Sequence, residues 1–108
     1  MPTVGEIIKS KRLKMGLMQS DVAIKLGIDA PMLSKIEKGL RRLNREQIRK
    51  VASILDTDQE ELLTIWLADQ IYDIVKDEKF ASEAIRVIGE KIYSNITQKQ
   101  KIITYRKT

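Results

Sequence analysis

The stretch QSDVAIKLGIDAPMLSKIEKG, residues 19–39, decides the fold of this chain. It places apolar residues at helical spacing on both sides of Gly27. Two short helices joined by a tight turn must cross steeply, so a small residue at Ala23 allows their close approach and Gly27 relaxes the backbone. Asp29 is suited to cap the second helix, and Pro31 is tolerated in its first turn. We therefore predict two short helices that cross at Gly27.

Helical spacing continues on both sides of this stretch, and no alternating β-branched run predicts a strand. Asn44 and Gln47 have the spacing of a capping box, and Asp58 is placed to cap the helix that follows. The chain is therefore predicted to be all-α. The expected helices cover about residues 3–15, 19–26, 29–38, 44–55, 58–76 and 81–94, with a polar, basic tail at 96–108 that includes Ile102, Ile103 and Tyr105.

Composition narrows the possible functions. The chain is 43% hydrophobic and 32% charged, which fits a globular protein. It has no histidine and no cysteine, which removes imidazole bases, thiolate nucleophiles and the usual zinc ligands. No phosphate-binding glycine motif is present either. We expect no enzyme, metal site, cofactor or small-molecule ligand. No apolar run is long enough to span a membrane and no signal-peptide region is seen, so the expected location is cytoplasmic.

The net charge of +5 is distributed unevenly. Residues 1–57 contain 12 Lys and Arg against 6 Asp and Glu, whereas residues 58–80 contain 2 against 7. Residues 81–108 are basic again, with 6 against 2. A basic front half suits a nucleic-acid partner, although a solvated charged surface would look the same. The acidic middle segment suits a surface directed away from DNA.

The run IKSKRLKMGLMQSDVAIKLGIDAPMLSKIEKG, residues 8–39, resembles the helix-turn-helix DNA-binding domain of phage-repressor-like (XRE-type) regulators. The similarity rests on Arg-x-x-x-Gly-Leu-x-Gln, on Ala and Gly at turn spacing, and on Leu-Ser-x-Ile-Glu-x-Gly. It covers about residues 5–67. The resemblance implies a five-helix DNA-binding domain at residues 1–67, followed by an additional C-terminal helix in a helical extension at 68–108.

The resemblance also implies roles for particular residues. Gln19 matches a family position that hydrogen-bonds a DNA phosphate, although it could be an ordinary surface residue at a helix start. Arg12 and Glu37 match a pair that forms an internal salt bridge between the first and third helices. We interpret that pair as structural.

The edge expected to face DNA departs from the family's habit, because it has few base-reading side chains. Ala30, Pro31 and Met32 cannot hydrogen-bond bases; they could pack on thymine methyl groups or only shape the helix start. Lys35 is the best candidate for contacting guanine, with a phosphate contact as the alternative. The predicted edge comprises Asp29, Ala30, Pro31, Met32 and Lys35, with Ser34 and Lys38 closer to the DNA backbone.

Three arginines, Arg41, Arg42 and Arg45, follow the predicted docking helix. In the family this segment runs along the DNA backbone, where an arginine can enter a narrow minor groove. The alternative is a solvated basic loop.

The last third of the chain carries more apolar residues than a small domain needs. These residues could enlarge the core of one molecule or form a two-fold dimer interface. The candidates for dimerisation are Trp66, Ile71, Tyr72, Ile74, Val75, Ile85, Ile88 and Ile92. The expected function is a homodimeric, sequence-specific regulator of double-stranded DNA, a repressor or autoregulator on a palindromic operator. The alternative is an antitoxin or protein-interaction module whose C-terminal helices bind a partner protein.

Overall fold

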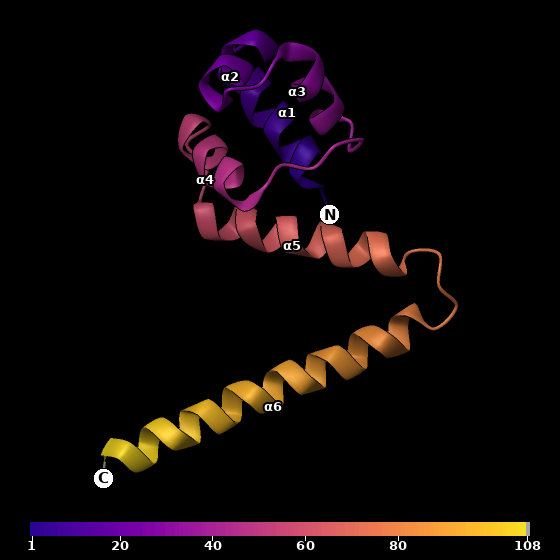
Figure 1. Ribbon diagram of the computed structural model, residues 1–108, viewed down its shortest axis with the longest axis vertical. Helices are drawn as coiled ribbons and strands as arrows, with labels where there is room; N and C mark the ends of the chain where they lie inside the picture. Colours follow the sequence, from indigo (N-terminus) through magenta and orange to yellow (C-terminus); the bar gives the residue numbers. More distant parts are fainter. Residues whose placement is uncertain (108) are drawn as a thin grey trace. The chain divides into compact units, whose positions relative to one another are not determined.

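The computed structural model describes the backbone of residues 1–107 and the side chains of residues 1–98. Over the described backbone the chain contains helices and no strand, so the all-α prediction is confirmed (Figure 1). The chain divides into two compact units, Met1–Asp73 and Ile74–Thr108. The helices are α1 (Val4–Lys14), α2 (Gln19–Leu26), α3 (Ala30–Glu37), α4 (Arg45–Ile54), α5 (Gln59–Val75) and α6 (Ala81–Lys107).

Three helices begin at the predicted capping residues. Asp29 Oδ1 accepts a hydrogen bond from the backbone N–H three residues later, at 2.8 Å. Asn44 and Gln47 exchange side-chain to backbone hydrogen bonds of 2.8 and 2.9 Å, which form a capping box. Asp58 caps α5 in the same way, at 3.0 Å. Each bond satisfies a backbone donor that has no partner within the helix, so these starting points are set by local chemistry.

The turn between α2 and α3 has the geometry that Gly27 predicted. Gly27 has a φ of 73°, in the left-handed region where a side chain would be strained. The N–H of Ile28 donates to the carbonyl of Ala23 at 3.0 Å and closes the end of α2. Ala23 itself is buried, as a close crossing of the two helices requires.

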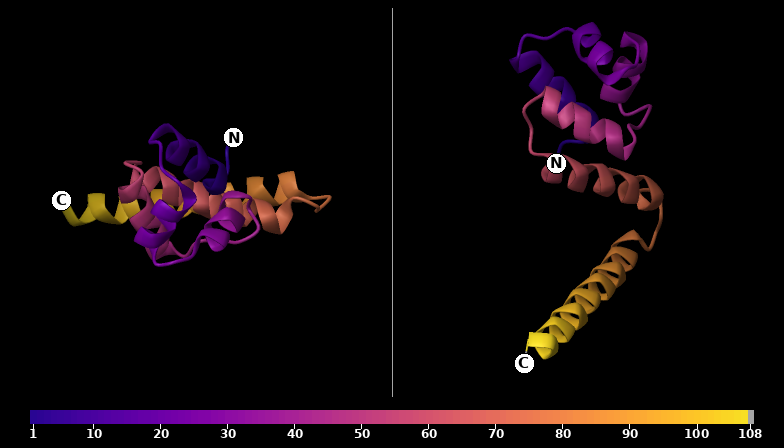
Figure 2. Two further views of the ribbon diagram at one scale, coloured as in Figure 1. Left: turned by 90° about the horizontal axis from the view of Figure 1, so that it is seen from above. Right: turned by 60° about the vertical axis from the view of Figure 1, so that its left-hand side comes forward.

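The core of the first unit lies among α1, α2, α3, α4 and the start of α5. Contacts join α2 to α3 and α4, and α1 to α3, and Figure 2 shows these helices stacked around one another. Apolar residues that recur at helical spacing supply the core, because that spacing places them on one face of each helix. The buried apolar residues are Val4, Ile8, Val22, Ala23, Leu26, Leu33, Ile36, Leu43, Ile48, Val51, Ala52, Leu55 and Leu62.

Hydrogen bonds attach α5 to α1 and to the loop before α4. Asp69 Oδ2 accepts from the backbone N–H of Val4 at 2.9 Å, at the start of α1. Trp66 Nε1 donates to the carbonyl of Leu43 at 2.7 Å. The first compact unit therefore continues along α5 to Asp73, past the boundary at residue 67 that the resemblance implies.

The described part of the second unit contains the last two residues of α5 and the helix α6, whose predicted end was wrong. We predicted an end near Ser94, whereas α6 continues to Lys107. No glycine or proline follows Gly89 to stop it, and the hydroxyl of Thr97 bonds to the carbonyl of Tyr93 within the helix. A polar sequence was mistaken for a helix end. The apolar patch at Ile102, Ile103 and Tyr105 lies outside the described side chains.

Candidate DNA-binding site

A buried ion pair joins α1 to α3 behind the candidate DNA-binding surface. Arg12 Nε and Nη2 donate to the two carboxylate oxygens of Glu37 at 2.7 and 3.0 Å. Only 9% of the Arg12 side chain and 2% of the Glu37 side chain is exposed. Arg12 Nη1 also donates to the carbonyl of Leu17 at 3.0 Å. The pair is bidentate and desolvated, so it fixes the relative position of the two helices.

The environment of this pair keeps both groups charged. Burial alone would raise the pKa of Glu37, but hydrogen bonds from Arg12 and Gln19 outweigh it, and the pKa lies below its ordinary value. The hydrogen bond with Glu37 raises the pKa of Arg12 despite burial. Arg12 and Glu37 therefore both remain charged at neutral pH, next to the candidate DNA-binding surface.

Gln19 is held by the same carboxylate. Its Nε2 donates to Glu37 Oε1 at 3.0 Å, and the residue is half-buried at the start of α2. An amide nitrogen has two hydrogens, so one remains for an acceptor outside the protein. The ion pair thus orients the residue that the family resemblance assigns to a DNA phosphate.

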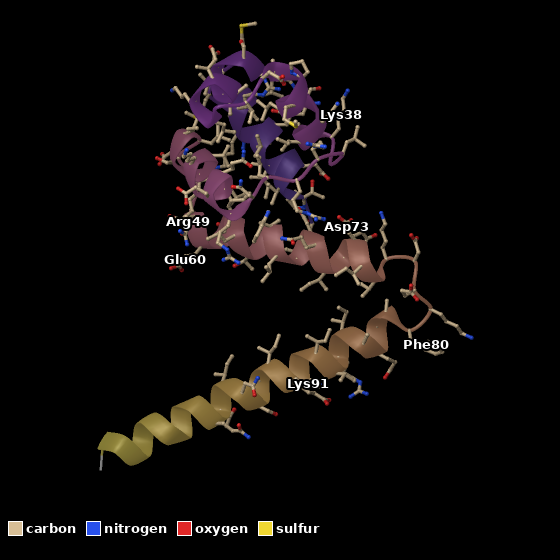
Figure 3. All side chains as sticks on the ribbon, in the orientation of Figure 1. Lys38, Arg49, Glu60, Asp73, Phe80 and Lys91 are labelled. Atoms are coloured by element: carbon tan, nitrogen blue, oxygen red, sulfur yellow. The ribbon has the colours of Figure 1, made fainter. Side chains whose placement is uncertain are left out.

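The exposed edge of α3 is apolar at its start and basic one turn later. One oxygen of Asp29 is used as the helix cap. Ala30 and Met32 are half-buried, and Pro31 is exposed. Ser34 is half-buried, whereas Lys35 and Lys38 are exposed, and Lys38 projects from the end of α3 (Figure 3). Since residues four apart share a helix face, Pro31 and Lys35 point the same way.

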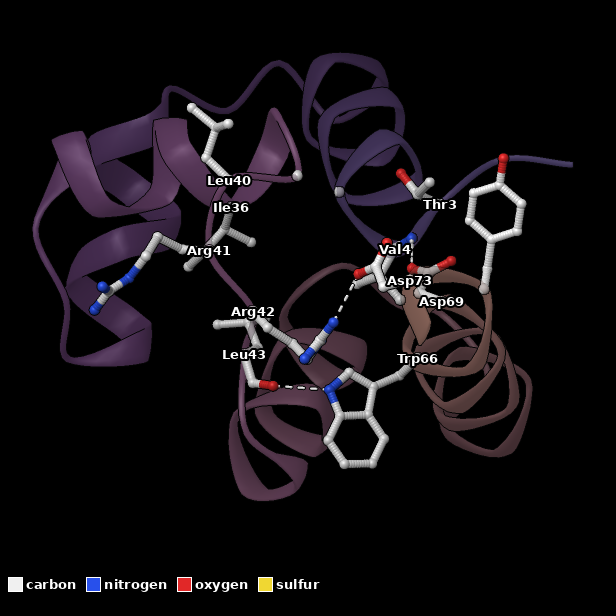
Figure 4. A pocket seen from close by; sticks show the side chains of 13 residues that line it. Thr3, Val4, Ile36, Leu40, Arg41, Arg42, Leu43, Trp66, Asp69 and Asp73 are labelled. Atoms are coloured by element: carbon white, nitrogen blue, oxygen red, sulfur yellow. Dashed lines mark hydrogen bonds and ion pairs between the residues drawn. The ribbon is translucent and has the colours of Figure 1, made fainter. Parts of the chain in front are cut away.

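Residues 40–45, which we name the basic segment, contact α5 through two of their three arginines. Arg42 Nη2 lies 2.7 Å from Asp73 Oδ2, and the guanidinium of Arg45 lies 5.2 Å from the centre of the Trp66 ring. Arg41 extends to the other side of the segment (Figure 4). The sequence predicted three similar arginines. The structure gives each of them a different environment.

A cavity of about 430 Å³ lies beside the basic segment, lined also by the start of α1, the end of α3, and α5. Gly5 forms part of its wall, and a Cβ there would lie 2.4 Å from the carbonyl oxygen of Ile36. The helices can approach this closely only because residue 5 is glycine. The sequence analysis missed Gly5, Asp69 and Asp73, because their contacts join distant parts of the chain.

The candidate dimerisation residues fall into different environments. Trp66 is half-buried and packs against the core of its own unit. The others on α5 and α6 are exposed or half-buried. Val75 is half-buried. The exposed residues are Ile71, Tyr72, Ile74, Ile85, Ile88 and Ile92.

Two kinds of site are absent from the part of the chain that the structure describes. No cluster of acidic, histidine or cysteine side chains there is suited to hold a metal ion. None of the helices searched there is long and apolar enough to cross a membrane.

Comparison with known proteins agrees with this geometry. A family model described as Helix-turn-helix matches residues 8–62, which contain the ion pair, the α2–α3 turn and the basic segment. The chain belongs to this helix-turn-helix family. The resemblance to phage-repressor-like, XRE-type regulators is confirmed. By its family, the chain is a DNA-binding transcriptional regulator.

One relative and two solved structures extend the comparison. The HTH-type transcriptional regulator SinR of Bacillus subtilis (strain 168) is 29% identical over 98 residues, which cover 90% of this chain and 84% of SinR. The solved SinR protein/SinI protein complex matches with a TM-score of 0.51 and 26% identity, over 97% of this chain and 95% of that one. A hypothetical protein from E. coli shares the fold, with a TM-score of 0.63 and 20% identity, over 78% and 86% of the two chains.

Proposed function

We propose that this protein is a homodimeric, cytoplasmic repressor that binds a palindromic operator. The observation that carries the proposal is the division of the chain into two unlike units. The first unit has its own core and a basic surface on α3 and the basic segment. The described part of the second contains α6 and the last two residues of α5, and the described isoleucines of α6 are exposed.

Lys35 is the proposed base-reading residue of the first unit. It is exposed, and it is the first residue of α3 whose side chain is both exposed and able to donate a hydrogen bond. A lysine can donate to guanine O6 and N7 in the major groove. Pro31, on the same face, offers only an apolar contact, which suits the methyl group of a thymine. Lys38 and Arg41 would contact phosphates.

The stripe on α6 supports the homodimer. Ile85, Ile88, Ile92 and Ile96 recur every three or four residues and therefore share one face. On a different face, Arg86 forms ion pairs with Glu83 and with Glu90. A second copy of the same stripe would cover the apolar face, and a two-fold dimer would present two α3 helices to an inverted repeat.

Selection from a random duplex library tests the proposal. We expect an enriched inverted repeat with half-sites about one helical turn, roughly 10 base pairs, apart. Affinity for the selected duplex should fall steeply with salt, with a slope of about −0.9 per phosphate contact. Repression of a reporter promoter that contains the selected site tests the direction of regulation. Enrichment of a single half-site, or of no sequence, would contradict the dimeric, sequence-specific proposal.

A second function is suggested by the SinR protein/SinI protein complex, in which a similar chain is bound to another protein. The exposed stripe of α6 would then be covered by a partner protein, as in an antitoxin or an interaction module. Size measurement of the purified protein separates the two functions. A dimer supports the repressor, whereas a monomer that binds no duplex at low salt supports the partner-binding protein.

A further inference from the structure

The basic segment is held against α5 by three contacts within the first unit, and Figure 4 shows two of them, Trp66 with Leu43 and Arg42 with Asp73. The indole N–H of Trp66 donates to the carbonyl of Leu43 at 2.7 Å. The Arg45 guanidinium lies over the same indole ring. Arg42 forms its ion pair with Asp73, which lies about two turns after Trp66 on α5. Because Leu43 is buried in the core, the segment is anchored in its middle and Arg42 is kept within reach of Asp73.

The ion pair between Arg42 and Asp73 is open to solvent. The exposed fractions of the two side chains are 47% and 51%. An exposed pair of this kind is weak, so an outside anion can exchange with the carboxylate. A DNA phosphate presents the same kind of charged oxygen acceptor to a guanidinium. Asp73 therefore occupies the guanidinium of Arg42, which is the group that a DNA phosphate would contact.

We propose that Asp73 is a positioning residue that competes with a DNA phosphate for Arg42 and so lowers the affinity for DNA. The inference rests on the proposed contact between the basic segment and the DNA backbone. In the wild-type complex, Arg42 either stays on Asp73 and makes no phosphate contact, or moves to the phosphate and leaves the carboxylate nearby. The first loses a contact with DNA, and the second breaks the ion pair and places two negative charges close together. Both weaken binding.

The position of Asp73 connects this competition with the association of α5 with another protein chain. Asp73 ends the first unit and lies between Tyr72 and Ile74, two exposed residues among the candidates for dimerisation. A protein chain that covers these neighbours would change the surroundings of the carboxylate. Association at α5 and affinity for DNA would then be linked through one side chain.

The test compares Asp73→Asn with wild type on a duplex of arbitrary sequence at low salt and on the selected operator. Asparagine keeps the shape but lacks the charge. We expect Asp73→Asn to bind both duplexes about two- to fivefold more tightly, the range that corresponds to the strength of an exposed ion pair. The salt dependence should become steeper by about 0.9, the contribution of one additional phosphate contact. A merely structural role would leave that slope unchanged.

Two further variants serve as controls. Glu60→Gln removes the same charge from the exposed start of α5, so a gain equal to that of Asp73→Asn would overturn the proposal. Arg42→Ala combined with Asp73→Asn should lose the gain, and keeping it would also overturn the proposal. An unchanged slope in folded Asp73→Asn contradicts the inference. Absence of sequence preference, with a steeper slope on the arbitrary duplex, contradicts only the proposed operator.

Discussion

The two units of this chain use the same apolar residue types in different ways. In Met1–Asp73, five helices bury a shared core, and a desolvated ion pair lies beside it. In Ile74–Thr108, the isoleucines whose side chains are described are exposed, and the ion pairs that Arg86 forms are between neighbours on the surface of α6. An amphipathic helix is stabilised mainly by packing its apolar face, not by its own hydrogen bonds. The first unit therefore packs its apolar faces within itself, whereas the apolar face of α6 is open, which is why we propose that another chain covers it.

The largest expected effect tests the first unit. Arg12→Ala leaves Glu37 charged and buried without its partner, which should lower the free energy of unfolding by about 3–5 kcal/mol. Urea denaturation at neutral pH measures this loss. Arg86→Ala is a suitable control, because its ion pairs are exposed and should contribute only about 0.2–1 kcal/mol. Equal losses for the two variants would remove the contrast between the units.

The next effect tests the second unit. Ile88→Lys places a charge in the α6 stripe of each subunit, and should weaken dimerisation about 100-fold or more, since each buried isoleucine contributes roughly 1.5–3 kcal/mol. Sedimentation equilibrium measures the dissociation constant. Val87→Lys makes the same change on the opposite face of α6 and should leave the dimer intact. If both variants dimerise like wild type, the stripe is not the interface.

A smaller effect tests which unit reads DNA. Lys35→Ala should relax the preference at one base pair of each half-site, by about 1–3 kcal/mol, because the donor to the base is removed. Affinities for a set of single-base operator variants measure this change. Lys38→Ala should weaken binding to all of them equally. A uniform loss for Lys35→Ala would assign Lys35 to a phosphate.

The smallest effect is the pH dependence of the ion pair. The pKa of Glu37 is lower in the folded protein than in the unfolded chain, so its contribution is complete above the unfolded value of about 4.3. That contribution is lost as the pH falls through the folded pKa. The stability difference between wild type and Glu37→Gln should therefore shrink in acid. A difference that stays constant from neutral pH to below the folded pKa would contradict the assigned shift.

Local features of the fold were predictable because their physical causes lie within a few residues. Asp29, Asn44 and Asp58 cap helices through bonds that reach three residues along the chain. Gly27 ends α2 because its own backbone adopts a positive φ. The end of α6 was missed because polarity alone does not stop a helix that lacks a glycine or proline.

The sequence by itself determined the positions of the helices apart from the end of α6, the turn at Gly27 and the family, and it predicts the residues that face DNA. Only the tertiary structure decided that α5 contacts the basic segment and holds it in place. Its contacts join residues far apart in the chain, with separations of 65 for Val4 and Asp69, 31 for Arg42 and Asp73, and 23 for Leu43 and Trp66. Helical periodicity extends over a few turns and cannot specify which distant side chains meet. Packing of the core brings these residues together, and it gives three similar arginines three different environments.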